Sequence, residues 1–295
     1  MDKIRALTVF RRIVELGSFQ AAATDLKLSK AAVTKNINEL EISLDTPLIN
    51  RTTRKLVVTE SGLDFYREVC VALDTINNAE QTLFFNRGHI AGKLKIGCPV
   101  SLGIEVINRL ICEFSDVYPN VSIEILMDDR HLDLISQGVD VAIRGTGALA
   151  DSSLKSRKLN EIKRTLCASQ TYLDAFPPIL SPLDLKSHQC LGYSLSSSNT
   201  WRFDRGGEVE EVDVTFSHFT VNNSLALVEA ATLSKGVILT PYTYVKSKLD
   251  SGELVEILPD WLPKHHYLYA VYPSSRAHSK LVRSFIDFLI ERILV

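Results

Sequence analysis

The sequence lacks the long apolar runs and the strong net charge that identify several large protein classes. No segment approaches the roughly 20 consecutive apolar residues that a membrane helix needs, and no basic-then-apolar leader opens the chain. The formal net charge of the 295 residues is only −2. These absences argue against a membrane protein, so we expect a cytoplasmic protein with no membrane partner.

Cysteine and histidine are scarce, and neither is spaced for chemistry. The five cysteines form no CxxC pair and predict reduced thiols, most of them filling the core. The seven histidines show neither HxxxH nor HExxH spacing, and the adjacent His265 and His266 would point to opposite faces of a strand. No GxSxG nucleophile elbow or P-loop occurs. We therefore expect no enzyme, no metal and no cofactor.

What the sequence does contain is an ordinary globular composition over a length typical of two domains. Apolar residues make up 45% of the chain and aromatic residues 8%. The charge is uneven: the first 62 residues hold ten Lys/Arg against seven Asp/Glu, a balance of +3, which leaves −5 for the remainder. A modestly basic head on an acidic body is compatible with a phosphate-binding module, although the signal is weak.

Residues 18–37, SFQAAATDLKLSKAAVTKNI, predict two short amphipathic helices joined by a tight turn. Ser18 and Ser29 are each placed to cap a helix N-terminus, and small alanines would let the two helices cross closely. The outward face of the second helix carries side chains suited to phosphates or base edges, namely Lys30, Thr34, Lys35 and Asn38. Taken alone, the pattern also fits an ordinary helical hairpin with a solvated face.

A first helix is expected over residues 2–16, and a wing is expected after the hairpin. Asp45, a residue that tolerates the left-handed conformation, precedes Pro47 and can end the second hairpin helix. Residues 48–59, LINRTTRKLVVT, predict two short strands around a basic turn with Arg51, Arg54 and Lys55 near its tip. A two-stranded wing on three helices is a winged helix-turn-helix, whose wing tip reaches the sugar-phosphate backbone.

At these motifs the chain resembles a LysR-type transcriptional regulator, over essentially its whole length. The motifs are SFQAAATDLKLSKAAVTKNINELE at 18–41, PLINRTTRKLVVTESG at 47–62 and VDVAIRGTG at 139–147. Ala31, Asp45 and Ile49 depart from the family's commonest residues, which leaves the base specificity unreadable. The resemblance implies a homodimer or homotetramer on a partly palindromic operator in double-stranded DNA. The expected DNA-binding residues are Ser18, Gln20, Ser29, Lys30, Ala31, Thr34, Lys35, Asn38, Arg51, Thr53, Arg54 and Lys55.

Residues 59–87 predict one long helix that contains no proline. Its apolar stripe has little within one chain to pack against except a second copy, and the resemblance implies a linker helix that pairs antiparallel with the same helix of another subunit. We expect a winged head at 1–58, this linker and dimerisation helix at 59–88, and an effector-binding regulatory domain at 89–295. The stripe consists of Leu63, Tyr66, Val69, Cys70, Leu73, Ile76, Leu83 and Phe84.

Beyond a glycine-containing hinge at 86–93, strands and helices alternate, which implies a parallel sheet. A first lobe at about 93–167 and 267–295 and a second at about 168–266 would be joined by two crossovers. The expected fold class is therefore α+β or α/β: a winged helix-turn-helix, a long linker helix and a two-lobed α/β effector domain resembling periplasmic binding proteins. A free-standing solute-binding protein would have no use for the winged head.

In such folds ligands bind at the carboxyl ends of parallel strands and at helix N-termini, which attract anions. We expect Ser101, Arg144 and a cap at Asn222 to face a small anionic effector from both lobes. Bland alternatives remain, because serine and asparagine are ordinary N-caps and Arg144 could pair with Asp129 or Asp140. A redox-sensing regulator of the same architecture, switched by Cys98 at the cleft mouth, is a second alternative. The expected effector-binding residues are Pro99, Val100, Ser101, Arg130, Arg144, Thr146, Asn222, Ser224 and Pro241.

Overall fold

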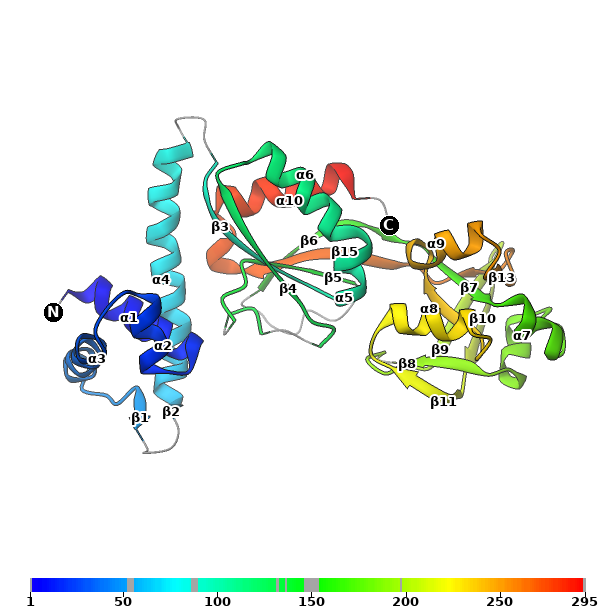
Figure 1. Cartoon of the computed structure of the whole chain (residues 1–295), viewed down its shortest axis with the longest axis horizontal. Helices are drawn as coiled ribbons and strands as arrows, with labels where there is room; N and C mark the ends of the chain where they lie inside the picture. Colours follow the sequence, from blue (N-terminus) through cyan, green and yellow to red (C-terminus); the bar gives the residue numbers. More distant parts are fainter. Residues whose placement is uncertain are drawn as a thin grey trace.

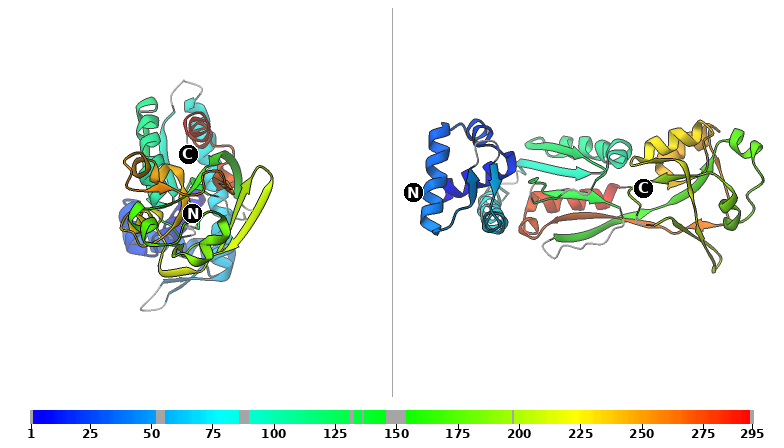
Figure 2. Two further views of the ribbon diagram at one scale, coloured as in Figure 1. Left: turned by 90° about the vertical axis from the view of Figure 1, so that its right-hand side faces the viewer. Right: turned by 90° about the horizontal axis from the view of Figure 1, so that it is seen from below.

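The computed structural model describes residues 2–51, 56–85, 90–130, 133–135, 137–145, 154–196 and 198–293. The N-terminal head, the first lobe and the second lobe of the C-terminal half follow one another along the long axis (Figures 1 and 2). The head and the second lobe therefore occupy opposite ends of the molecule. This arrangement confirms the expected fold class.

The head is the winged helix-turn-helix that the sequence predicts. Ser18 and Ser29 cap the second and third helices, with their hydroxyl oxygens accepting hydrogen bonds from Ala21 N and Ala32 N. Asp45 ends the third helix in the left-handed conformation, with φ 47°. The interior is built on Phe10, which packs with apolar residues from all three helices. The elements are α1 (Lys3–Leu16), α2 (Phe19–Asp25), α3 (Lys30–Leu44) and the antiparallel wing strands β1 (Ile49–Arg51) and β2 (Leu56–Val58).

The long helix α4 (Glu60–Phe85) packs against its own head, so the expectation that its apolar stripe has little within one chain to pack against is wrong. Half of the apolar stripe has a partner within the chain, because these residues complete the core around Phe10: Tyr66, Val69, Cys70 and Leu73. Leu63, Val71 and Ile76 remain exposed, at 44%, 44% and 39%. The periodicity correctly identified a buried face of α4 but not the surface that covers it.

The first lobe is a five-stranded sheet in the order β4-β3-β5-β15-β6. Strand β3 is parallel to both β4 and β5, as the alternation predicts, whereas β15 runs antiparallel to both of its neighbours. The strands are β3 (Gly92–Cys98), β4 (Val121–Met127), β5 (Val141–Arg144), β6 (Leu154–Ile162) and β15 (His266–Pro273).

Helices cover the first-lobe sheet and share an aromatic core with it (Figure 1). The segment α5 (Val100–Leu102), a π-helical turn at Gly103–Ile107 and α6 (Asn108–Val117) follow one another without a break, and α10 (Lys280–Arg292) lies beside α6. The ring of Phe114 meets those of Phe285 and Phe288 edge-on, each at 5.2 Å. The alternation of strands and helices predicts a short helix between β4 and β5, at 132–137, but the described residues of that range form a turn.

The second lobe contains small sheets that the sequence predicted only in part. Strand β7 lies between β12 and β13, both antiparallel to it, while β8 and β11 pair in parallel. The hairpin β9–β10 and helix α7 were not foreseen. The elements are β7 (Arg164–Ala168), α7 (Gln170–Ala175), β8 (Cys190–Tyr193), β9 (Thr200–Arg205), β10 (Glu208–Asp213), β11 (Phe216–Val221), α8 (Ser224–Thr232), β12 (Ile238–Pro241), α9 (Tyr242–Asp250), β13 (Val255–Glu256) and β14 (Leu262–Pro263), with 3₁₀ turns at Pro182–Ser187 and Ser274–Arg276.

Two crossovers join the lobes, as expected. The chain leaves the first lobe at the end of β6 and enters the second with β7, one residue later. It returns between β14 and β15. The register pairs His266, the first residue of β15, with Ile162, the last residue of β6. The two crossovers therefore run next to each other.

Candidate functional site

The third helix of the head presents a polar face to solvent. Val33, Ile37 and Leu40 are fully buried, and the opposite side of α3 is exposed at Lys30, Ala31, Lys35 and Asn38. Ser29 and Gln20 are also exposed, while Thr34 and Ser18 are half-buried. Arg51 ends β1, and the predicted wing residues Thr53, Arg54 and Lys55 lie outside the described residues.

A buried network of ion pairs joins the head to the first lobe. Asp74 of α4, only 4% exposed, accepts hydrogen bonds from Arg11 of α1 at 2.7 Å and lies 3.1 Å from a guanidinium nitrogen of Arg276. Arg276 also lies 2.8 Å from Asp140, which precedes β5. Tyr66 of α4 adds a hydrogen bond to the carbonyl of Ile135 at 3.0 Å. The network therefore links α1, α4 and the sheet of the first lobe.

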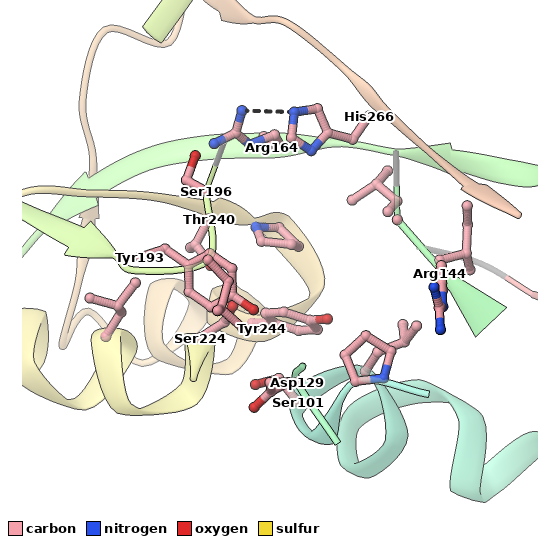
Figure 3. Close-up of a pocket in the computed structure, with 18 of the residues that line it drawn as sticks. Ser101, Asp129, Arg144, Arg164, Tyr193, Ser196, Ser224, Thr240, Tyr244 and His266 are labelled. Atoms are coloured by element: carbon pink, nitrogen blue, oxygen red, sulfur yellow. Dashed lines mark hydrogen bonds between the residues drawn. The ribbon is translucent and has the colours of Figure 1, made fainter. Parts of the chain in front are cut away.

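A cleft of about 700 Å³ lies between the two lobes (Figure 3). Its walls include Pro99, Ser101, Arg130, Arg144, Ser224 and Pro241, six of the predicted effector residues. Val100 and Asn222 are not among its lining residues, and Thr146 lies outside the described residues. The second lobe contributes an apolar and aromatic wall that includes Tyr193, Leu227, Leu239 and Tyr244.

The helix N-terminus that was expected to hold an external carboxylate already holds one from the chain. Val100 N donates to Asp129 Oδ1 at 2.9 Å, and Asn223 Nδ2 of the other lobe donates to Asp129 Oδ2 at 3.0 Å. Asp129 therefore bridges the two lobes. From the sequence, Asp129 was considered only as a partner for Arg144. Its contacts with Val100 and Asn223 join segments that are distant in the sequence, so only the folded structure reveals them.

Two N-cap expectations are corrected here. Ser101 does not cap its helix: Pro99 occupies the N-cap position, and Ser101 Oγ accepts a hydrogen bond from Leu225 N of the second lobe at 3.3 Å. Asn223, rather than Asn222, caps α8, with its side-chain oxygen accepting from Leu225 N and Ala226 N at 3.0 and 3.2 Å. Either of the adjacent asparagines can cap a helix, so the sequence alone did not decide between Asn222 and Asn223.

Arg164, the first residue of β7, is a cleft residue that sequence reasoning missed. Its Nη1 lies 3.3 Å from His266 Nε2, and its Nη2 donates to the carbonyl of Leu239 at 3.4 Å. Burial lowers the pKa of Arg164 to about 10. Burial, together with the charges of Arg164 and Lys264, lowers the pKa of His266 to about 4. The sequence held one signal for this residue, because Arg164 is a charged residue directly before the apolar run TLCA at 165–168.

Two other arginines, Arg130 and Arg144, line the same cleft from the first lobe. Arg130 is exposed and pairs with Asp128 at 3.5 Å. Burial lowers the pKa of Arg144, which ends β5. The acids proposed as partners for Arg144 are engaged elsewhere, since Asp140 pairs with Arg276 and Asp129 holds the backbone of Val100.

Neither Cys98 nor the adjacent histidines His265 and His266 form a reactive centre in the cleft. Cys98 lines the cleft but is buried, and burial raises the pKa of its thiol to about 12, which disfavours the reactive thiolate. His265 contacts Glu161 while its neighbour His266 contacts Arg164, so the two do not act as a pair. Within the same residues, no cluster of His, Cys, Asp and Glu could hold a metal ion. No described helix is both long and apolar enough to span a bilayer.

Two family models together match nearly the whole chain. Residues 4–63 match "Bacterial regulatory helix-turn-helix protein, lysR family", and residues 87–293 match "LysR substrate binding domain". The chain is 31% identical to the HTH-type transcriptional activator AaeR of Escherichia coli K12 over 272 residues, which cover 92% of this chain and 88% of AaeR. It is 33% identical to the HTH-type transcriptional regulator PtxR of Pseudomonas aeruginosa over 288 residues, covering 97% and 92%.

Solved structures resemble the chain along its full length. The full-length virulence activator AphB of Vibrio cholerae has a TM-score of 0.61 at 30% identity, with 98% of this chain and 99% of AphB covered. CrgA, a LysR-type transcriptional regulator of Neisseria meningitidis, has a TM-score of 0.61 at 30% identity, with 97% of each chain covered. These similar proteins are transcriptional regulators rather than enzymes.

Proposed function

Because this chain belongs to the LysR family of bacterial transcriptional regulators, we propose that paired heads bind a partly palindromic operator and that a small anionic effector in the interlobe cleft switches them. Members of the family bind DNA and small effectors as oligomers. The head would comprise residues 1–58, the linker helix 59–88 and the effector domain 89–295. The protein would act in the cytoplasm, where the operator DNA lies.

The polar face of α3 supports its role as the recognition helix. Lys30, Lys35 and Asn38 are exposed on the side opposite the buried Val33 and Ile37. Lysine is suited to phosphate and asparagine to the N6/N7 edge of adenine. Two such helices, spaced by about 34 Å, would read an inverted repeat. The exposed apolar side chains of α4, Leu63, Val71 and Ile76, support pairing with a second copy.

The cleft between the lobes is the observation that carries the effector part of the proposal. It is lined from both lobes and lies beside the crossovers, so a ligand there would touch both halves of the domain. Closure of the lobes would reach the head through the ion-pair network of Arg11, Asp74, Arg276 and Asp140. Such a switch is a population shift, which requires the effector to bind one assembly more tightly than the other.

A salt-resolved gel shift with a footprint, on DNA directly upstream of the protein's own gene, tests the proposal. We expect a protected inverted repeat. The Lys35→Ala variant should weaken binding to all sequences and reduce the slope of log affinity against log salt by about 1. Lys186→Ala, an exposed lysine of the second lobe, is the control and should change neither quantity. Unchanged affinity and slope in Lys35→Ala would remove Lys35 from the interface.

A further inference from the structure

The interlobe cleft contains a half-buried cation that no acid among the described residues neutralises. The partners of the Arg164 guanidinium are an imidazole nitrogen at 3.3 Å and a backbone carbonyl at 3.4 Å. Among the described residues no carboxylate pairs with it, and burial alone displaces its pKa. A buried charge without a counter-ion is costly to the fold. Such a group in a cleft is therefore a candidate ligand site.

The two neighbours of Arg164 hold its guanidinium without satisfying it. His266 is uncharged at neutral pH because its pKa is lowered to about 4, so its Nε2 can accept a hydrogen bond from Arg164. The Leu239 carbonyl accepts a second. A guanidinium has five N–H donors arranged as a planar fork, so these two contacts leave donors for a further acceptor. A carboxylate matches that fork with two parallel hydrogen bonds.

The opposite side of the cleft is unfavourable for an acidic ligand. Figure 3 shows Asp129 and Ser101 on one side of the cleft and Arg164 with His266 on the other. Asp129 already accepts the hydrogen bonds of Val100 N and Asn223 Nδ2. A second carboxylate placed there would meet a like charge and compete for the same donors. Tyr193 and Tyr244 lie between the two sides in Figure 3, and Leu239 also lines the cleft.

We propose that Arg164 binds the acidic group of the effector, and that the effector is a monocarboxylate whose apolar body lies along the wall formed by Tyr193, Leu239 and Tyr244. The inference rests on the proposed effector cleft and fixes the direction in which the ligand lies. The acid points to the crossovers, away from the start of α5.

Benzoate is the probe that tests the site, with benzamide as a neutral ligand of nearly the same shape. Binding to the full-length protein is measured by calorimetry and by the fluorescence of Trp201, which lines the cleft. We expect saturable binding of benzoate and at least about tenfold weaker binding of benzamide. Arg164→Gln should weaken benzoate by about tenfold or more, as expected for the loss of a charge-assisted hydrogen bond. Arg109→Gln, an exposed arginine of α6 outside the cleft, is the control and should stay within about twofold of wild type.

Several results would overturn the assignment. Equal binding of benzoate and benzamide by the wild type would do so, as would unchanged benzoate affinity in Arg164→Gln. Hexanoate, an aliphatic monocarboxylate, serves as a second probe. If neither benzoate nor hexanoate binds saturably at concentrations up to about 10 mM, the assignment of Arg164 as a carboxylate site is wrong. If circular dichroism shows that Arg164→Gln is misfolded, Arg164→Lys decides the question. It keeps the charge but loses the fork, so its preference for benzoate over benzamide should shrink.

The operator footprint is repeated with the same variants to separate the two proposals. If a cell metabolite alters the footprint of Arg164→Gln as it alters that of the wild type, the cleft still switches the protein and only the role of Arg164 is wrong. If the wild type protects no operator at all, the regulatory proposal itself fails, whatever benzoate does.

Discussion

Replacing Asp74 by asparagine removes the central charge of the network between the head and the first lobe while keeping the side-chain shape. The Asp74 carboxylate lies 2.7 Å from Arg11 and 3.1 Å from Arg276, and it is buried. Breaking a buried ion pair usually costs about 3–5 kcal/mol. Arg11 retains Glu15 at 2.8 Å and Arg276 retains Asp140 at 2.8 Å. We therefore expect the lower end, about 3 kcal/mol from the free energy of unfolding of the head and linker helix.

The positions of the tryptophans allow this loss to be localised. Both tryptophans, Trp201 and Trp261, lie in the second lobe, so their fluorescence reports that lobe alone. Far-UV circular dichroism also reports α1–α4 of the head. In urea, a loss of about 3 kcal/mol at an m-value of about 1–3 kcal/mol/M should lower the midpoint of the dichroism transition by about 1–3 M in Asp74→Asn. The fluorescence transition should not move.

The control for this experiment is Asp64→Asn, which removes an exposed pair with Arg67 on the same helix. It should change the stability by less than about 0.5 kcal/mol. Equal shifts of the dichroism and fluorescence transitions in Asp74→Asn would refute a role confined to the head and first lobe. An unshifted dichroism transition would refute the network's contribution altogether.

Two further predictions concern the cleft. Asp129→Asn removes the carboxylate that holds Val100 N, so hydrogen exchange at the start of α5 should accelerate by about tenfold; Asp128→Asn is the control, and unchanged exchange would contradict the bridge. His266 has a pKa of about 4 when folded against 6.5 ordinarily, so the unfolded chain takes up a proton first as the pH falls. Stability should therefore decline from pH 6.5 towards 4, as measured by far-UV circular dichroism in urea, and His266→Gln should flatten this decline. An equally steep decline in the variant would assign the effect to another group.

The winged head could be predicted from the sequence because its signals are local. Ser29 lies directly before an amphipathic repeat, and Asp45 precedes a turn that ends at Pro47. The adjacent Asn222 and Asn223 show the limit of such signals, since either can cap a helix and only the path of the chain decides between them. The stripe on α4 likewise revealed that Tyr66 is buried, but not that α1 covers it.

The cleft was harder to predict because its chemistry depends on what is absent from the surroundings of a side chain. Arg164 begins β7, and nothing local in the sequence shows that its guanidinium meets an imidazole and a carbonyl rather than a carboxylate. Asp129 appeared as a neighbour for an arginine, yet it engages two segments that are distant in the sequence. Burial and pairing of charges are properties of the assembled fold.

The contact between Arg164 and His266 ties together the two points at which the chain passes from one lobe to the other. If the lobes rotate relative to each other, the two crossovers form the hinge. A ligand bound at Arg164 would therefore act directly on this hinge. Across the cleft, Asp129 holds the two lobes together through the hydrogen bonds that it accepts from Val100 N and Asn223 Nδ2. An acidic effector bound at Arg164 would therefore shift the population towards one orientation of the two lobes at their crossovers, while Asp129 still bridges the lobes.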